Sequence, residues 1–316
     1  MKFKYLFRRL PFSAAFLIFC LSNCWAWEPT RSDLSEAFLL WATPRAEYSG
    51  RPQQEAYELL MADSPAAALE LPKFLNTPSG SIRDKILTIC ENMGAQAVGP
   101  AFRPHAGPDS PQIGIVMYCL SRSHDTESLP ILLRNLKHPR WQIRSTAALS
   151  LGYLGPHSAI ADILAALKTE TYPLARKSLA FAAGQCCDSA GVTPEILDAL
   201  IGALDDPYYA VRFNASRALA GLDLPAYREL QARYDNLSDT GRYGALYVLG
   251  RTQNLFARPV LEKIAADTGA APRLRAVALK GLLDQKWAPA DTALEDLRAM
   301  PVGRGMPTFG HSSAMS

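Results

Sequence analysis

Residues 136–155 read LKHPRWQIRSTAALSLGYLG, and residues 204–219 read LDDPYYAVRFNASRAL. The two stretches share a leucine, a proline three residues later, and a β-branched residue followed by arginine. They also share an alanine three residues after that arginine and a leucine seven residues after it. One copy of this pattern leaves an apolar face that it cannot bury alone. Its recurrence therefore predicts units stacked side by side around a continuous core.

The same frame extends along most of the chain when the arginine of each copy is numbered zero. The zero positions are Arg83, Ile113, Arg144, Ala175, Arg212, Arg242 and Arg275, and the gaps between them are 30, 31, 31, 37, 30 and 33 residues. Positions minus one, 3, 7 and 10 share one face of a helix, and position 7 is apolar in every unit. We therefore predict an all-α protein, a right-handed α-solenoid of stacked helix pairs of about 30–31 residues each. This stripe of each second helix should be buried.

The two ends of the chain differ from the repeats. Residues 1–26 have the pattern of a signal peptide, and residues 27–63 that of a helical N-terminal cap formed by a degenerate repeat. The repeat array is expected over residues 64–289. Residues 290–316 are expected to hold a final helix over Asp291–Met300 and a disordered tail, because the rest is rich in Gly, Ser, Met and Pro and has no periodicity.

The first 26 residues predict export. Four basic residues lie within the first nine positions, and the apolar run from Leu10 to Leu21 that follows is shorter than the roughly 20 residues that span a bilayer. Cys24 and Ala26 supply the small residues of a cleavage site. We expect a periplasmic or secreted protein with no stable transmembrane span after processing. A lipid anchor on Cys24 is the minority alternative, since Asn23 fits a lipidation motif poorly.

The charge of the chain argues against general nucleic-acid binding. The full sequence carries 33 Lys and Arg against 30 Asp and Glu. Residues 1–26 hold four of the basic residues and no acidic one, so the rest carries 29 against 30. General nucleic-acid binding depends on a basic surface. We therefore expect no nucleic-acid partner.

The clearest copy of the repeat, from Leu204 to Ala215, resembles HEAT repeats. It is similar to the short HEAT-like units of bacterial proteins and of phycobilin lyase-associated proteins, and the resemblance covers about residues 64–285. In this family an Asp of one unit typically hydrogen-bonds the neighbouring Arg, and Asp206 and Arg212 match these two positions. The resemblance implies an α-helical binding scaffold and implies no chemistry.

Catalytic motifs are missing from the sequence after residue 26. It holds no G-x-S-x-G, H-E-x-x-H, phosphate-cradling loop or C-x-x-C. None of the five His residues is followed by Glu, whereas the HEAT-like metal hydroxylases bind iron through His-Glu pairs. We therefore predict no enzyme activity, no metal site and no cofactor.

Four cysteines follow residue 26. Cys90 and Cys119 fall near the same point of adjacent second helices, whose axes should lie roughly 8–10 Å apart. A disulfide usually needs Cα atoms within about 7 Å, so we favour two buried thiols over a disulfide, which an exported protein permits. Cys186 and Cys187 lie in the widest gap. An ordinary loop pair is favoured there over a vicinal disulfide or a reactive thiol.

A surface is the best functional candidate. Positions 1, 5 and 9 lie opposite the buried stripe, on the outer side of the second helices, which in HEAT arrays lines the concave face. Aromatic and Arg residues are the types that anchor interfaces, and the alternative is an ordinary solvated face. The candidate partner-binding residues are Tyr118, Arg122, Tyr153, Arg176, Phe213, Arg217, Tyr243, Tyr247, Arg251 and Lys280.

Two functions of different classes fit this surface. The first is an exported, non-enzymatic scaffold that binds a protein or peptide along the concave face. The second is a lyase or chaperone-like protein that handles a small ligand or chromophore in the same groove. A long shallow groove would favour the scaffold, whereas a deep groove with a buried carboxylate or thiol would favour the lyase.

Overall fold

The structure, a computed structural model, describes residues 31–43, 51–77, 79–187, 191–251 and 255–287. Within these ranges every regular element is a helix and none is a strand. The expected signal peptide, the helix over Asp291–Met300 and the C-terminal tail all lie outside the described residues. No helix within the described ranges is both long enough and apolar enough to cross a bilayer.

The chain divides into two compact units, with one ending at Gly191 and the other beginning at Val192. The division falls inside the widest gap of the repeat frame. The α-helices of the first unit are α2 (Arg31–Ala42), α3 (Arg51–Ala62), α4 (Ser64–Glu70), α5 (Gly80–Met93), α6 (Ala95–Phe102), α7 (Ile113–Arg122), α8 (Leu129–Asn135), α9 (Trp141–Leu154), α10 (Ile160–Thr169) and α11 (Pro173–Gln185). The helices of the second unit are α12 (Pro194–Gly202), α13 (Tyr209–Gly221), α14 (Leu224–Arg233), α15 (Asp239–Leu249), α16 (Arg258–Ala266) and α17 (Pro272–Asp284).

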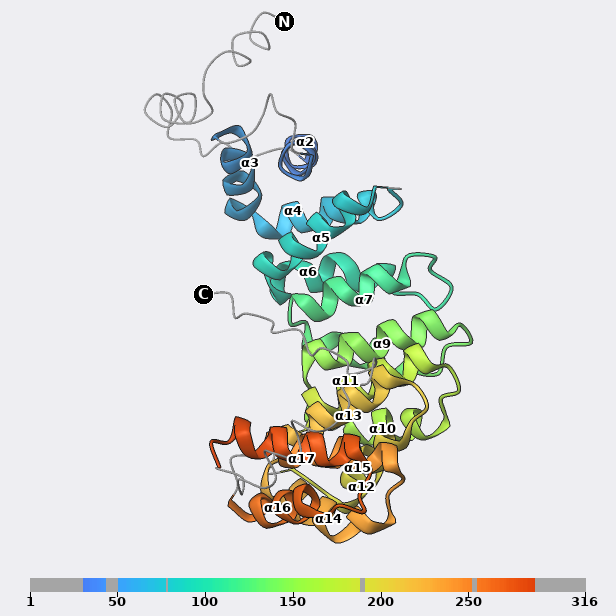
Figure 1. Ribbon diagram of the computed structural model, residues 1–316. Helices are drawn as coiled ribbons and strands as arrows, with labels where there is room; N and C mark the ends of the chain where they lie inside the picture. Colours follow the sequence, from blue (N-terminus) through green and yellow to red (C-terminus); the bar gives the residue numbers. More distant parts are fainter. Residues whose placement is uncertain (1–30, 44–50, 78, 188–190, 252–254, 288–316) are drawn as a thin grey trace, which may run out of the picture. The chain divides into compact units, whose positions relative to one another are not determined.

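In the first unit the second helices of successive repeats pack on one another. Helix α7 lies between α5 and α9, and α9 lies between α7 and α11 (Figure 1). The first helices α6, α8 and α10 pack against α7, α9 and α11 respectively. Helices α2 and α3, within residues 27–63, pack against each other and against α4.

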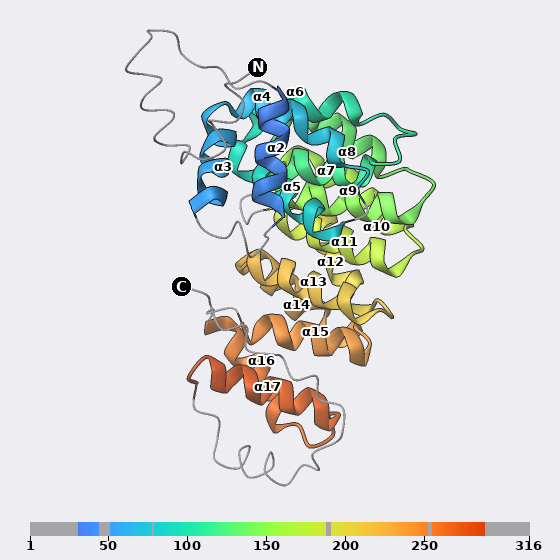
Figure 2. The same cartoon turned by 90° about the horizontal axis from the view of Figure 1, so that it is seen from above.

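The second unit repeats this arrangement. Helix α15 packs between α13 and α17, and the first helices α12, α14 and α16 contact them from the other layer (Figure 2). The all-α solenoid of stacked helix pairs expected from the sequence is therefore confirmed.

The buried stripe is also confirmed at its centre. Positions 3 and 7 are buried in all seven units, and Ala147, Ala215 and Leu151 have no exposed surface. Burying a Leu side chain stabilises a fold by about 1.5–3 kcal/mol. Positions minus one and 10 are less regular, because they lie near the helix ends: Leu154, for example, is only half-buried.

The predicted frame is one residue too early in the fourth repeat. Arg144 and Arg212 each lie four residues after the residue that caps their helix and donate to backbone carbonyl groups of the preceding loop. In α11 the residue four after the cap Tyr172 is Arg176, and it donates to the Thr171 carbonyl. The true zero position is therefore Arg176, which the predicted frame had placed at position 1, and its side chain is half-buried. Arg176 lies 32 residues after Arg144, one more than the 31 that the predicted frame allowed.

Candidate functional site

The outer face of the second helices is accessible in both units. With Arg176 as the fourth zero position, none of the residues at positions 1, 5 and 9 is buried in any of the seven repeats. The corrected frame also moves Phe181 onto this face, at position 5 of its repeat. The sequence offered a signal for this change, because Ala175-Arg176 resembles Ile143-Arg144 and Val211-Arg212.

In the first unit three rings form a row across three helices, which we call the aromatic row: Tyr118 on α7, Tyr153 on α9 and Phe181 on α11. The ring centroids of Tyr118 and Tyr153 are 6.3 Å apart, and those of Tyr153 and Phe181 are 5.8 Å apart at a steep angle. Both separations are typical of favourable aromatic pairs. Tyr153 keeps 40% of its surface exposed, so the row is packed together and yet open to a partner.

Arg122 contacts the middle ring of the aromatic row. Its guanidinium carbon lies 5.2 Å from the centre of the Tyr153 ring, within the range of a cation–π contact. Its Nη2 also lies 2.6 Å from the Glu91 carboxylate. Arg122 therefore joins α5, α7 and α9 on this face.

A glycine allows the row to form close to the backbone. A Cβ atom added to Gly152 would lie 2.6 Å from Cε1 of Phe181 and 3.2 Å from the Cα of Ala182. Because Gly152 has no side chain, the Phe181 ring lies directly against α9 beside Tyr153. Any larger residue at this position would displace the ring.

The second unit carries a separate group of rings and arginines, which we call the α13–α15 face. It consists of Tyr209, Phe213 and Arg217 on α13, Tyr243 and Tyr247 on α15, and Arg251, two residues beyond the end of α15. The Tyr209 and Phe213 rings are 6.1 Å apart and nearly parallel. The Arg217 guanidinium lies 5.9 Å from the Phe213 ring centre, and the Arg251 guanidinium lies 5.1 Å from that of Tyr247. Tyr209 was not among the residues selected from the sequence, because it precedes zero by three positions.

Partial burial affects the hydroxyl groups on both faces. Desolvation raises the pKa of Tyr118, with a smaller contribution from Tyr153, while a hydrogen bond with Thr146 acts in the opposite direction. Desolvation also raises the pKa of Tyr209 and of Tyr243, and Tyr247 adds to both rises. All of these phenols are therefore neutral at physiological pH and can donate or accept hydrogen bonds.

Lys280 is not part of either group. It forms an exposed ion pair with Asp284 at 3.0 Å, one turn further along α17. Exposed pairs of this kind contribute little to stability. Arg176 is likewise separate, because its guanidinium holds the loop before α11. The structure thus gathers eight of the ten predicted residues into two groups.

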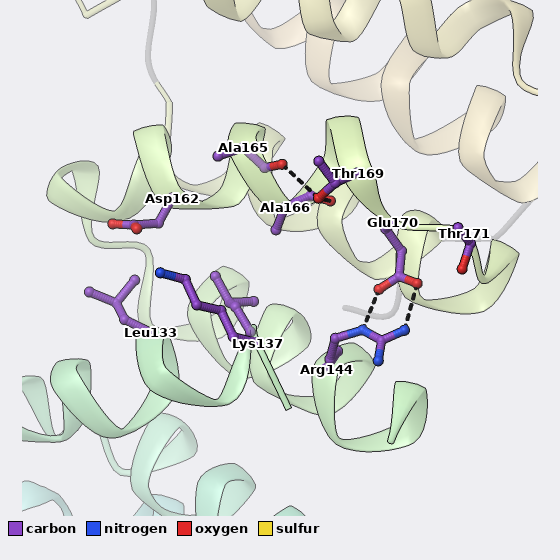
Figure 3. A pocket seen from close by; sticks show the side chains of 10 residues that line it. Leu133, Lys137, Arg144, Asp162, Ala165, Ala166, Thr169, Glu170 and Thr171 are labelled. Carbon is purple, nitrogen blue, oxygen red and sulfur yellow. Dashed lines mark hydrogen bonds and ion pairs between the residues drawn. The ribbon is translucent and has the colours of Figure 1, made fainter. Parts of the chain in front are cut away.

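The first helices of the first unit border a pocket of about 440 Å³, shown in Figure 3. Lys137 and Asp162 face each other across it, and Arg144 and Glu170 form its polar end. Arg144 donates two hydrogen bonds to Glu170, of 2.6 and 2.8 Å. These bonds lower the pKa of Glu170 against the opposing effect of desolvation, and they raise the pKa of Arg144. Each group satisfies the other, so neither offers an acid or a base.

The Arg144–Glu170 pair is a contact between neighbouring repeats of the kind that the family resemblance implied, in which an acidic side chain of one repeat bonds the arginine of its neighbour. We call this contact the inter-repeat rung. Glu170 lies six residues before Arg176, as Asp206 lies six before Arg212. Both carboxylates also accept a hydrogen bond, 2.8 Å long, from the backbone N–H two residues later. Glu170 therefore takes the place of the family's Asp in this repeat, and the rung connects it to the arginine of the repeat before.

The thiols show no sign of activation. Cys90 and Cys119 are free and fully buried, and desolvation raises the pKa of Cys90, followed by its contact with Cys119. Burial raises the pKa of Cys186 to about 12, and its Sγ donates to the Leu151 carbonyl at 3.4 Å. A nucleophilic thiol needs a lowered pKa and access. Among the described residues, no three His, Cys, Asp or Glu side chains gather as metal ligands would.

The sequence comparisons agree with this architecture. Residues 106–184, which span α7 to α11 except the last residue of α11, match the family model for HEAT repeats. The described residues thus form an all-α fold of stacked helix pairs, in which residues 106–184 match HEAT repeats. No curated protein matches the chain.

The chain also has low-identity matches among solved structures. The complex of CpcE and CpcF of phycocyanin lyase from Nostoc sp. PCC7120 is 18% identical, with 86% of this chain and 94% of that chain covered and a TM-score of 0.34. An engineered protein is 15% identical, with 85% and 87% covered and a TM-score of 0.45. Human deoxyhypusine hydroxylase in complex with glycerol is 17% identical, with 85% and 89% covered and a TM-score of 0.27. Likenesses at this level carry no argument about activity.

Proposed function

We propose that this protein is an exported, non-enzymatic scaffold that binds a protein or peptide along the outer face of its second helices. The observation that supports this most is the aromatic row. Three rings from three helices pack in sequence on an accessible face, with an arginine on one of them. A merely solvated helix face is expected to carry Glu and Lys at these positions, whereas Tyr, Phe and Arg are typical of binding sites.

The alternative of a lyase or chaperone-like protein has less support. The thiols of Cys90 and Cys119 are fully buried, and Glu170 is held by Arg144. Two further carboxylates of the first unit, Glu70 and Asp125, are also buried, and each forms an ion pair, with Lys73 and Arg103 respectively. Their surroundings hold them in structural roles.

Site-specific photocrosslinking in cells that produce the protein tests the binding face. A photoreactive residue at Leu149, at position 5 of the repeat that contributes Tyr153, is expected to capture a partner. Replacing Tyr118 and Tyr153 with Ala is expected to abolish that capture while the melting temperature changes little, because truncating an interface anchor typically costs about 2 kcal/mol or more of binding.

The control is a photoreactive residue at Asp162, which is exposed on α10 in the other layer of helices. Equal capture from Leu149 and Asp162, or capture from Leu149 that survives the double replacement, would contradict the proposal. Unfolding of the double variant would show instead that these rings belong to the core.

Export has its own test. N-terminal sequencing of the protein from its native cells is expected to begin at Trp27. A cytosolic protein that begins at Met1 would refute export, and a lipid on Cys24 would establish the anchored alternative.

A further inference from the structure

We infer that the α13–α15 face binds an acidic peptide segment, which would make the partner of the proposed scaffold a carboxylate-bearing polypeptide. This inference rests on the proposed function, since it names the chemistry of the segment that the scaffold holds. It concerns the second unit alone and uses none of the residues of the aromatic row.

The first support is the state of two arginines. Arg217 and Arg251 are both exposed, and among the described residues neither has a carboxylate within ion-pair distance. Each lies instead over an aromatic ring. Arg251 also donates from Nη1 to the Tyr247 hydroxyl. The remaining N–H groups of these two exposed guanidinium groups can donate to a carboxylate.

Some other cations of the same unit do contact carboxylates. Arg233 contacts both Asp198 and Glu229, and Arg258 contacts Glu262 at 2.7 Å. This unit therefore has carboxylates that can pair with arginine, and the pairs named here lie on its first helices. The α13–α15 face keeps its two guanidinium charges without them.

The second support is the balance of charge. The described part of the second unit carries twelve Lys and Arg against eleven Asp and Glu, so the unit is nearly neutral. At positions 1, 5 and 9 the charged residues are Arg217, Arg251 and Lys280 against Asp284, which pairs with Lys280. A local positive face on a neutral unit selects an anionic partner by complementarity. It is too small for general nucleic-acid binding, which draws on a broad basic surface.

The third support is the set of rings around the two charges. Tyr209 is 45% exposed, and Phe213, Tyr243 and Tyr247 are half-buried beside it. Tyr side chains offer a flat apolar surface and a hydroxyl at little cost in conformational entropy. These rings fit the aliphatic and proline residues of an extended segment, while Arg217 and Arg251 fit its carboxylates.

Selection from a phage library of random dodecapeptides tests this inference on the processed full chain. Peptides selected on the wild type are expected to be rich in Asp and Glu. The variant Arg217→Glu with Arg251→Glu is expected to bind the best synthetic peptide roughly tenfold more weakly or worse, because each change removes a charge-assisted hydrogen bond and adds repulsion. The neutral pair Arg217→Gln with Arg251→Gln should give a smaller loss.

The matched control is Arg228→Glu with Lys263→Glu. Both residues are exposed on first helices, α14 and α16, and their replacement gives the same net charge. This control is expected to bind the peptide within about twofold of the wild type, which is the scale of a distant screened charge. Circular dichroism should show that all three variants are folded.

Each outcome bears on one hypothesis. Selected peptides without an excess of Asp and Glu, or equal losses in the Arg217/Arg251 variant and its control, would overturn the acidic-segment inference and leave the scaffold proposal standing. If no peptide can be selected and crosslinking from Leu149 also fails, the scaffold proposal itself is contradicted. Binding of a fluorescein-labelled oligothymidylate at physiological salt that depends on Arg217 and Arg251 would overturn the inference in favour of nucleic acid.

Discussion

Gly250 and Gly281 lie where the backbones of α15 and α17 touch. A Cβ atom on Gly250 would be 2.7 Å from the Cα of Gly281, and a Cβ on Gly281 would be 2.8 Å from the Cα of Gly250. Cβ contacts under 3.0 Å essentially never occur and ordinary ones begin at 3.4 Å. Gly250→Ala therefore forces the two backbones apart by about 0.3 Å, and by about 0.7 Å if the contact becomes an ordinary one. Backbone cannot rotate away as a side chain can. Overpacking of this kind typically costs about 1–3 kcal/mol, and we expect Gly250→Ala to lower the free energy of unfolding by that amount.

The same chemical change elsewhere should have the opposite sign. A Cβ atom added to Gly202, the last residue of α12, would have no other atom within 4 Å. Gly202→Ala should raise stability by up to about 1 kcal/mol, because Ala loses less backbone entropy in a helix. Urea unfolding gives both values, and hydrogen exchange of peptides from α15 and α17 locates the change. If Gly250→Ala stabilises the protein as Gly202→Ala does, the two backbones are not in contact and the packing of α15 on α17 is wrong.

Three more expectations concern the core, the inter-repeat rung and the thiols. Ala147 is fully buried. Ala147→Asp should lower the free energy of unfolding by roughly 3 kcal/mol or more, because its carboxylate would be desolvated and unpaired. An unchanged urea midpoint would mean that Ala147 lies outside the core. Because Arg144 lowers the pKa of Glu170, their pair stabilises the fold above the unfolded glutamate pKa and loses this effect as pH falls through the folded value. The melting temperature of Glu170→Gln should therefore lie below that of the wild type at neutral pH and approach it in acid, and a constant difference would refute the assignment. Burial raises the pKa of Cys186 to about 12, so iodoacetamide should label the half-buried Cys187 first in the native protein, and preferential labelling of Cys186 would contradict its burial.

The repeat frame predicted the core well because burial in a stacked helix pair is periodic. Positions 3 and 7 lie on the stripe that the period predicts, and both are buried throughout. The frame did not predict the contacts between neighbouring second helices. Ser145 lies 2.8 Å from Ser178, and Gly250 touches Gly281, at positions that have no shared residue type. Such contacts depend on how far one repeat is offset from the next, which spacing along the chain does not specify.

The candidate face was predicted in part for a related reason. A helix face can be assigned from period alone, so Tyr118 and Tyr153 were placed correctly on it. Phe181 was missed because the repeat between Arg144 and Arg176 is one residue longer than the frame assumed, and an offset of one residue turns each counted position around the helix by about 100°. Tyr209 was missed because only positions 1, 5 and 9 were counted. A residue at the start of the helix, three positions before zero, can lie on the same face. The pairing of Glu170 with Arg144 needed the structure, since the sequence shows the two residues 26 apart with no common motif.

The close approach of Phe181 to Gly152 has a consequence for the kinetics of any complex formed there. A ring held against a neighbouring backbone has already lost most of its rotational freedom, so a ligand that docks on it faces a smaller entropic penalty of ordering. Preorganisation of this kind prolongs residence time more than it accelerates encounter. The glycine, which no ligand would touch, thereby influences how long a complex lasts.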